Sequence, residues 1–168
     1  MMIDSVSRDD LVCALGTRWQ GVSDAVMGGI SQAALAVDEQ GGRRCLRLRG
    51  DVRLDNNGGF IQMAIDLAPD AHPIDAMAFA GVRLVVRGND EDYSVHLRTS
   101  DLQRSWQSYR AHFHATDEWR EWHLPFAQFV PHRVETAFDA GRLRRIGLVA
   151  IGRAFHADLC LAEIALYD

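Results

Sequence analysis

The sequence predicts an all-β protein folded as an antiparallel β-sandwich. Two observations carry this prediction. About nine or ten short segments alternate apolar and polar residues, which is the pattern of strands with one buried face. Clusters of Gly, Asn, Asp and Pro separate these segments at the spacing of a sandwich. Helical and strand patterns do not alternate along the chain, so a parallel α/β sheet is not expected.

Turn clusters such as 55–59 and 88–92 bound the expected strands. Strand 44–50 shows their pattern, because Leu46 and Leu48 alternate with residues that face the other way. In chain order the expected strands are 33–37, 44–50, 60–67, 82–88, 93–98, 106–114, 119–124, 145–151 and 159–167, with a helical turn at 125–129 and no alternation over 131–142.

The composition is that of one domain spanning residues 1–168, with 48% hydrophobic and 24% charged residues. The net charge of −5 argues against a nucleic-acid binder, because such proteins present a basic field. The three cysteines fit neither a disulfide framework nor a zinc site, so we expect reduced thiols. No apolar run is long enough to span a membrane, and we expect a cytoplasmic protein.

The stretch Trp19–Ser31 has neither helical nor strand periodicity. It holds three glycines, and Asp24 follows a serine that suggests a hydrogen-bonded turn. We expect a structured loop, and loops held on a rigid scaffold often carry functional sites.

Three of the expected strands present polar outward faces that share one chemistry. If these strands are neighbours, they form a face of arginine and histidine side chains with one tryptophan. Guanidinium groups suit carboxylates, phosphates and sugar hydroxyls, and an aromatic ring suits a sugar or a peptide side chain. The alternative is a plain solvated sheet face. The candidate residues for ligand or partner binding are Arg83, Arg87, His96, Arg98, Trp106, Arg110 and His112.

Other motifs give weak signals. His112 and His114 lie two residues apart and offer two imidazoles to a metal, for which His96 or His123 is the candidate third ligand. No carboxylate or cysteine stands at ligand spacing, and no phosphate loop or nucleophile elbow is present. We therefore assign no catalytic residue, no metal and no cofactor, and we expect a protein that is not an enzyme.

The loop motifs resemble those of a known family when they are taken in order. The motif residues are Trp19, Ser23, Asp24, Met27, Gly28, Gly29 and Ser31, followed by Asn57, Gly58, Gly59 and Phe60. Further matches are Arg87-Gly88 with Tyr93, then Trp106, Tyr109, Phe113, Trp119, Leu124-Pro125-Phe126, Phe129 and Ile146-Gly147-Leu148. Over about residues 19–167 the chain resembles the complex I intermediate-associated protein 30 family, assembly factors for respiratory NADH:ubiquinone oxidoreductase. Ala25 departs from the family pattern, which has Gly there.

This resemblance implies a galactose-binding-like domain of the jelly-roll type, with no established catalytic residues. It implies a chaperone-like assembly factor that binds protein partners, respiratory complex I subunits or assembly intermediates. It also implies that loops 19–31 and 57–60 lie together at one rim, where their motif residues are mainly structural. The expected location is cytoplasmic, or peripheral at the inner membrane through partners.

Two alternatives to an assembly factor remain open. One is a carbohydrate- or small-anion-binding module that uses the concave sheet face; the other is an enzyme that uses His96, His112 or a carboxylate pair. A concave pocket with an exposed Trp106 and converging arginines favours the module. A contiguous apolar patch rimmed by polar residues favours the assembly factor.

Overall fold

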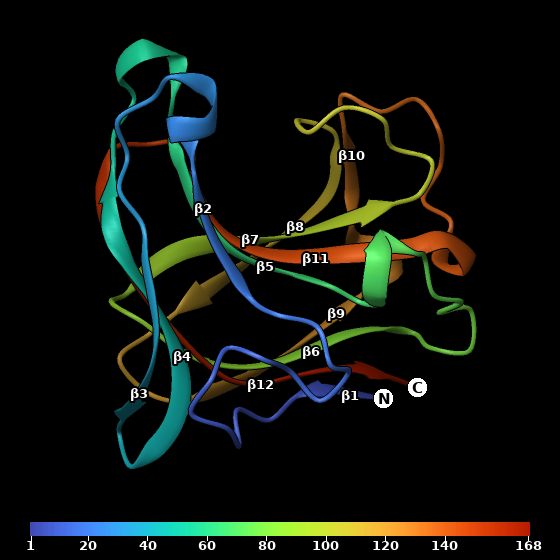
Figure 1. The fold of residues 1–168 in the computed structure, drawn as a ribbon, viewed down its shortest axis with the longest axis horizontal. Coiled ribbons are helices and arrows are strands. Elements are labelled where there is room, and N and C mark those ends of the chain that lie inside the picture. The colour runs from blue at the N-terminus through green and yellow to red at the C-terminus, as the bar shows by residue number, and fades with distance from the viewer.

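The computed structural model describes residues 1–168 and contains two antiparallel sheets packed face to face (Figure 1). The strands of one sheet, the β12 sheet, are β1 (Met2–Asp4), β3 (Ala34–Gln40), β4 (Arg43–Val52), β6 (Gly81–Arg87), β9 (Arg120–Pro125) and β12 (Phe155–Tyr167). They are ordered β3-β4-β12-β6-β9, and β1 also pairs with β12.

The other sheet, the β11 sheet, carries the candidate site. Its strands are β2 (Gln20–Ser23), β5 (Phe60–Asp66), β7 (Glu91–Thr99), β8 (Ser108–Ala115), β10 (Val130–His132) and β11 (Leu143–Ile151). They are ordered β10-β8-β7-β11-β5-β2. The prediction of an antiparallel β-sandwich is therefore confirmed.

Five short 3-10 helices connect the strands: η1 (Asp24–Met27), η2 (Asp55–Asn57), η3 (Pro69–Ala71), η4 (Phe126–Gln128) and η5 (Ala140–Arg142). The longest of them has four residues, and none of the helices could cross a membrane.

A core of 34 buried residues lies between the sheets. Alternation along the strands produces it, since the inward residues of β5 are Ile61, Met63 and Ile65 and those of β4 include Leu46 and Leu48. The remaining residues of the β11 sheet therefore face outward, where they are free to form a site.

Trp19 belongs to the core and is 1% exposed. Its indole Nε1 donates a hydrogen bond to Oδ2 of Asp4 at 2.7 Å, which satisfies the polar end of a buried ring. Trp19 thus fixes the start of β2, and with it the loop that follows.

The strand predictions fail in particular places. Stretch 19–31 begins with strand β2 and continues into η1, so it is a loop only from Gly28 onward. Strands β1 and β10 have three residues each, too few to show a period. Trp106 precedes β8 and lies in the turn that leads into it.

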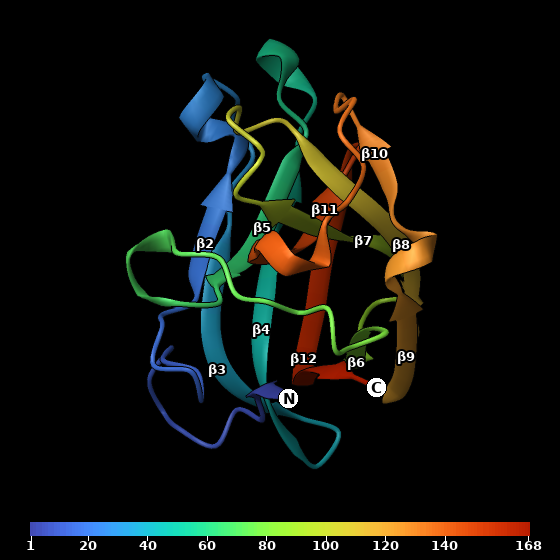
Figure 2. The same ribbon diagram turned by 90° about the vertical axis from the view of Figure 1, so that its right-hand side faces the viewer.

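The β11 sheet is bent into a trough (Figure 1). Helices η1 and η2 rise at one end of its strands, and β10 rises near the other. Figures 1 and 2 show η1, η2, segment 99–107 and β10 on the same side of the molecule. The outer face of this sheet is thus walled at both ends of its strands.

Candidate functional site: an arginine-lined cleft

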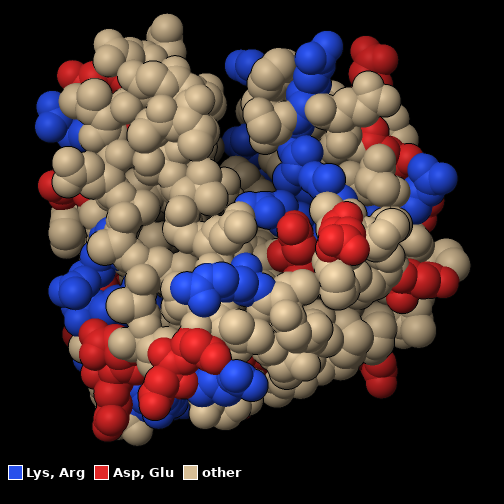
Figure 3. All heavy atoms as spheres, viewed as in Figure 1, with Lys and Arg blue, Asp and Glu red and all other residues tan.

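A cleft of about 490 Å³ lies on the outer face of the β11 sheet (Figure 3). Strand register builds its floor, because His96 of β7 pairs with Arg110 of β8 on one side and with Gly147 of β11 on the other. Residues at these positions face the same way. Gln62 and Val149 are opposite each other in the next row and complete the floor.

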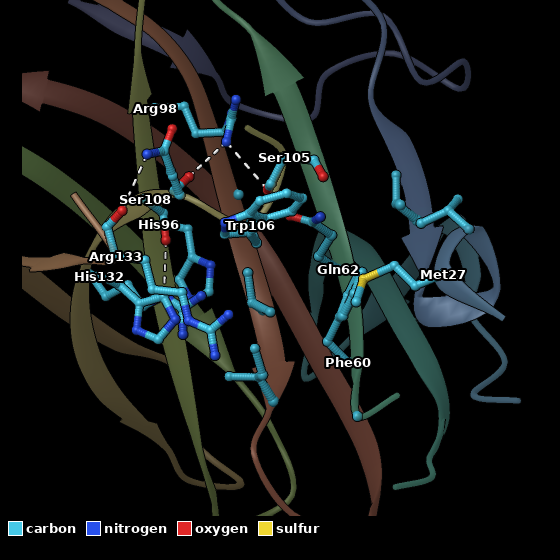
Figure 4. A pocket seen from close by; sticks show the side chains of 18 of the residues that line it. Met27, Phe60, Gln62, His96, Arg98, Ser105, Trp106, Ser108, His132 and Arg133 are labelled. Carbon is cyan, nitrogen blue, oxygen red and sulfur yellow. Dashed lines mark hydrogen bonds between the residues drawn. The ribbon is translucent and has the colours of Figure 1, made fainter. Parts of the chain in front are cut away.

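The two walls of the cleft differ in chemistry. One, which we call the arginine wall, forms where β7 and β10 end and β8 and β11 begin; it consists of Arg98, Ser105, Trp106, Gln107, Ser108, His132, Arg133, Arg144 and Arg145. The other, the apolar wall, forms where β2 and β11 end and β5 begins; it consists of Val22, Val26, Met27, Asn57, Gly58, Gly59, Phe60, Ile151 and Gly152. Figure 4 shows Met27 and Phe60 on one side and His132 and Arg133 on the other.

Four of the predicted binding residues meet in this cleft: His96, Arg98, Trp106 and Arg110. His112 lies on the same face of β8, but it is exposed and lies outside the cleft lining. A binding role for these residues is a proposal, which we develop below.

The expectation that Arg83 and Arg87 share this face is wrong. Both belong to β6, which pairs with β12 and β9 in the other sheet. Arg83 lies between Glu121 and Glu163, with Nη1 at 3.1 and 3.0 Å from their carboxylate oxygens. It closes an ion-pair network and does not contribute to the cleft.

Sequence reasoning missed four basic residues of the arginine wall: His132, Arg133, Arg144 and Arg145. The alternation of β11 puts Arg145 on the same face as Gly147, so that signal was present in the sequence. His132 and Arg133 fall in the region without alternation, and Arg133 has a left-handed backbone (φ 55°), which strand patterns do not describe.

The cleft has an excess of positive charge, although the chain as a whole is acidic. Five of the lining residues are arginines and none is Asp or Glu. Of the five, only Arg145 has a carboxylate partner, Asp66, at 3.0 Å. The guanidinium groups of Arg98, Arg110, Arg133 and Arg144 form no ion pair.

Burial and neighbouring positive charges lower the pKa values of basic groups in the cleft. Burial, followed by the charges of Arg110, His132 and His112, lowers the pKa of His96 to about 2, so its imidazole is neutral near pH 7. Burial and the charge of Arg133 also lower the pKa of Arg110. Nε2 of His96 and Nε of Arg144 are buried without a hydrogen-bond partner. Such unsatisfied atoms cost about 1–3 kcal/mol each, and they are the exception in folded proteins.

Arg98 holds the arginine wall together. Its Nη1 donates to three backbone carbonyl oxygens, those of Arg104 (2.8 Å), Ser105 (3.2 Å) and Gln107 (2.6 Å). Nε2 of Gln107 in turn donates to the carbonyl oxygen of Arg133 at 3.1 Å. The loop that carries Trp106 is thereby fixed, and the Trp106 side chain stays 49% exposed.

Asp24 holds the apolar wall together in a similar way. Its buried carboxylate accepts hydrogen bonds from the backbone N–H groups of Ser31 (2.9 Å), Gly59 (2.6 Å) and Phe60 (3.2 Å) and from the Ser31 hydroxyl. Burial alone would raise the pKa of Asp24, but these hydrogen bonds outweigh it and hold the pKa below its usual value. The two motif loops thus lie side by side, as the family resemblance implies, with Asn56 Nδ2 also 3.2 Å from the Gly28 carbonyl oxygen.

Two motif glycines leave room for this carboxylate. A Cβ on Gly58 would lie 2.6 Å from Oδ2 of Asp24, and a Cβ on Gly29 would overlap Oδ1. The Gly-Gly motifs are therefore explained by close approach of the two loops to Asp24. Met27 and Phe60 belong to the same motifs, and they also line the cleft.

The exposed apolar residues of these loops form what we call the apolar tip: Val26 (75% exposed), Met27 (56%), Ile30 (43%) and Leu54 (50%). It continues the apolar wall outward. Figure 3 shows this lobe at the upper left as mostly tan, with charged atoms along its outer edge, across the cleft from the blue arginine wall.

The other chemical candidates lie apart from the cleft. His114 is held between Asp90 and Asp92, with a ring nitrogen 2.7 Å from each carboxylate, and His123 belongs to β9 in the other sheet. Cys13, Cys45 and Cys160 are free and buried. No group of three or more metal-ligating side chains forms.

Together these observations define a galactose-binding-like β-sandwich fold with a cleft on the concave outer face of one sheet. The chain is similar to the family 11 carbohydrate-binding module from Clostridium thermocellum in complex with a β-1,3-1,4-mixed-linked tetrasaccharide (TM-score 0.76, 10% identity, 99% of this chain and 94% of that one). It is also similar to the family 30 carbohydrate-binding module of cellulosomal cellulase Cel9D-Cel44B of the same organism (TM-score 0.69, 14% identity, 100% and 99%). A third similar structure is an exo-β-agarase (TM-score 0.61, 9% identity, 99% and 25%).

At these identities the likeness concerns the fold alone. No curated protein sequence gives a match. The family is established independently, because residues 14–161 match the family described as Complex I intermediate-associated protein 30 (CIA30). The chain belongs to the CIA30 family.

Proposed function

We propose that this protein is a non-enzymatic binding protein of the assembly-factor kind, which holds a segment of a partner polypeptide in the cleft of the β11 sheet. One observation carries the proposal: a prearranged cleft with uncompensated arginines on one wall continues into an apolar tip on the other. Exposed apolar surface beside charged groups is the usual composition of a protein interface.

Membership of the CIA30 family supports protein partners as the ligand class. Under this proposal the partners are subunits or assembly intermediates of respiratory complex I. The protein then works in the cytoplasm, and it reaches the inner membrane through its partners.

The chemistry of the cleft argues against catalysis. A general acid or base works best with a pKa near the operating pH. The pKa of His96 is about 2 and its Nε2 is buried, so His96 stays neutral and is a weak general base near neutral pH. The remaining basic groups of the cleft are guanidinium groups, which stay protonated, and His132, whose pKa is lowered by burial and by Arg110 and Arg133.

The test is capture of partners from the native host with tagged protein. Three forms are compared: wild type, a double variant Arg110→Glu with Arg133→Glu, and a control Arg49→Glu. Arg49 is exposed on the β12 sheet and also lacks an ion pair, so its variant reverses one unpaired charge outside the cleft, whereas the double variant reverses two inside it. We expect wild type and control to enrich complex I subunits and the cleft variant to lose them. Absence of these subunits from the wild-type capture would contradict the proposal.

A carbohydrate-binding module is the second candidate. The exposed ring of Trp106 over a concave face favours it, and the similar solved structures include modules of this kind. A thermal-shift assay with the mixed-linked tetrasaccharide tests it. A ligand at 100 times its Kd stabilises a protein by about 2.7 kcal/mol, so a binder gives a clear shift.

A further inference from the structure

Resting on the proposed function, we infer that the segment held in the cleft is acidic, with carboxylates against the arginine wall and apolar side chains against Val26 and Met27. Neither the family nor the similar structures specify a negatively charged ligand. The inference depends on three features of the cleft: its donors, its missing counter-charges and its unequal walls.

The hydrogen-bond donors of the cleft favour a ligand that is rich in hydrogen-bond acceptors. Guanidinium groups have five N–H donors and no acceptor. Sugar hydroxyls both donate and accept, so a neutral sugar also needs acceptors from the protein. The uncharged side chains that can supply them are Gln62, Gln107, Asn57, Ser105, Ser108, His96 and His132, because the lining has no carboxylate. Carboxylates accept only, and they match the planar fork of arginine.

The missing counter-charges point the same way. Outside the cleft, arginines are generally paired: Arg47 lies between Asp38 and Asp158, and Arg83 between Glu121 and Glu163. Arg110, Arg133 and Arg144 have no such partner. Grouping like charges in a half-buried cleft is unfavourable, and a negatively charged ligand relieves it.

The unequal walls distinguish a peptide from an acidic glycan. A glycan chain presents polar groups along both edges, whereas Val26 and Met27 offer carbon and sulfur surface at 75% and 56% exposure. Successive side chains of an extended peptide point to opposite sides. A peptide that alternates acidic and apolar residues therefore presents one kind to each wall, and unbranched Met27 adapts to varied apolar partners.

The experiment measures binding of a fluorescein-labelled peptide of alternating glutamate and valine by fluorescence anisotropy. An otherwise identical peptide with glutamine in place of glutamate tests the charge. Oligogalacturonate and the neutral mixed-linked tetrasaccharide compete as the acidic and neutral glycans. The proteins are wild type, Arg110→Gln with Arg133→Gln, Val26→Ser with Met27→Ser, and the control Arg49→Gln.

We expect the glutamate peptide to bind, the glutamine peptide to bind about tenfold or more weakly, and binding to fall as salt rises. The arginine variant and the serine variant both weaken binding, and Arg49→Gln leaves it unchanged. Equal binding of the two peptides, no binding of the glutamate peptide, or stronger binding of either glycan would overturn the inference. If the peptide results overturn the inference but wild-type protein still captures complex I subunits and the arginine variant does not, the proposed function stands. If the glutamate peptide binds as expected but wild-type protein captures no complex I subunits, the proposed function is contradicted and the acidic ligand is not.

Discussion

The outer faces of the two sheets use the same residue for opposite purposes. On the β12 sheet, Nη2 of Arg47 lies 2.7 Å from Asp158 and its Nη1 lies 3.0 Å from Asp38, a closed network. On the β11 sheet, Arg110 has only the Ser108 hydroxyl, 2.8 Å from its Nε. A paired arginine on a sheet face stabilises the fold, whereas an unpaired one in a cleft is available to a ligand. The difference lies in the neighbours of each arginine.

Removal of the Asp24 carboxylate is expected to cause the largest loss of stability, because this carboxylate supports the wall opposite the arginines. Asp24→Ala leaves three backbone N–H groups without their acceptor, while the Ser31 hydroxyl can still donate to the carbonyl oxygen of Arg53 at 3.1 Å. We expect a loss of about 3–5 kcal/mol in the free energy of unfolding. Urea unfolding measures it, and hydrogen exchange at Gly59 and Phe60 localises it. The neighbouring exposed residue Asp55 provides the control Asp55→Ala; equal losses for both variants would contradict the role of Asp24.

The pH dependence of stability tests the burial of His96 beside the positive charges of the cleft. The pKa of His96 is about 2 in the folded state and 6.5 in the unfolded state, so between these values the unfolded state binds more protons. The contribution of His96 to the free energy of unfolding is therefore fully present above pH 6.5 and is lost as the pH falls toward 2. Between pH 7 and pH 5 we expect a loss of about 2 kcal/mol.

His114 provides the matched control for this experiment. Its hydrogen bonds to Asp90 and Asp92 raise its pKa, so its contribution is present at low pH and is lost as the pH rises through that raised pKa. Urea unfolding at both pH values should show a flatter profile for His96→Gln and a steeper one for His114→Gln. A profile unchanged by His96→Gln would show that His96 is not the titrating group.

Substitution of one arginine on each sheet tests whether the paired arginine stabilises the fold and the unpaired one does not. We expect Arg47→Gln to cost about 1–2 kcal/mol, because Asp38 and Asp158 lose their shared partner in a half-buried setting. Arg110→Gln should change stability by less than about 0.5 kcal/mol, or increase it, because it relieves repulsion from Arg133. Urea midpoints measure both. A larger loss for Arg110→Gln would make Arg110 a structural residue.

A small loss of stability is also expected from a substitution at the floor of the cleft. A Cβ on Gly147 would lie 2.5 Å from Oε1 of Gln62, which is the end of a flexible side chain and can move. Gly147→Ala should therefore cost about 1 kcal/mol or less, while it fills the floor beside His96 and weakens binding of the glutamate peptide. Unchanged peptide affinity would show that the ligand does not reach the floor.

Much of the fold could be predicted from the sequence, because strand alternation is local. Strands 60–67, 82–88 and 145–151 correspond to β5, β6 and β11 with ends shifted by one or two residues. The candidate site was predicted only in part, because sheet partners are set by distant contacts. Arg83 and Arg98 occupy equivalent outward positions on neighbouring segments, yet β6 and β7 belong to different sheets. No local pattern distinguishes the two.

The motif loops illustrate a second limit. Their glycines and Trp19 gave the family, and the contacts of Asp24 explain why glycine stands at positions 29 and 58. The exposure of Val26 and Met27 depends on how η1, which contains both residues, is oriented after β2, and the sequence does not encode that direction in any periodic pattern. The apolar tip therefore emerged only from the three-dimensional arrangement.

Site-specific photocrosslinking in the native host tests whether a partner polypeptide lies in the cleft between its two walls. A photoreactive residue is placed in turn at position 27 on the apolar wall, at position 106 on the arginine wall and at position 49 on the β12 sheet. We expect positions 27 and 106 to crosslink to the same partner polypeptide and position 49 not to crosslink to it. A partner crosslinked from position 49 but from neither cleft position would contradict this expectation.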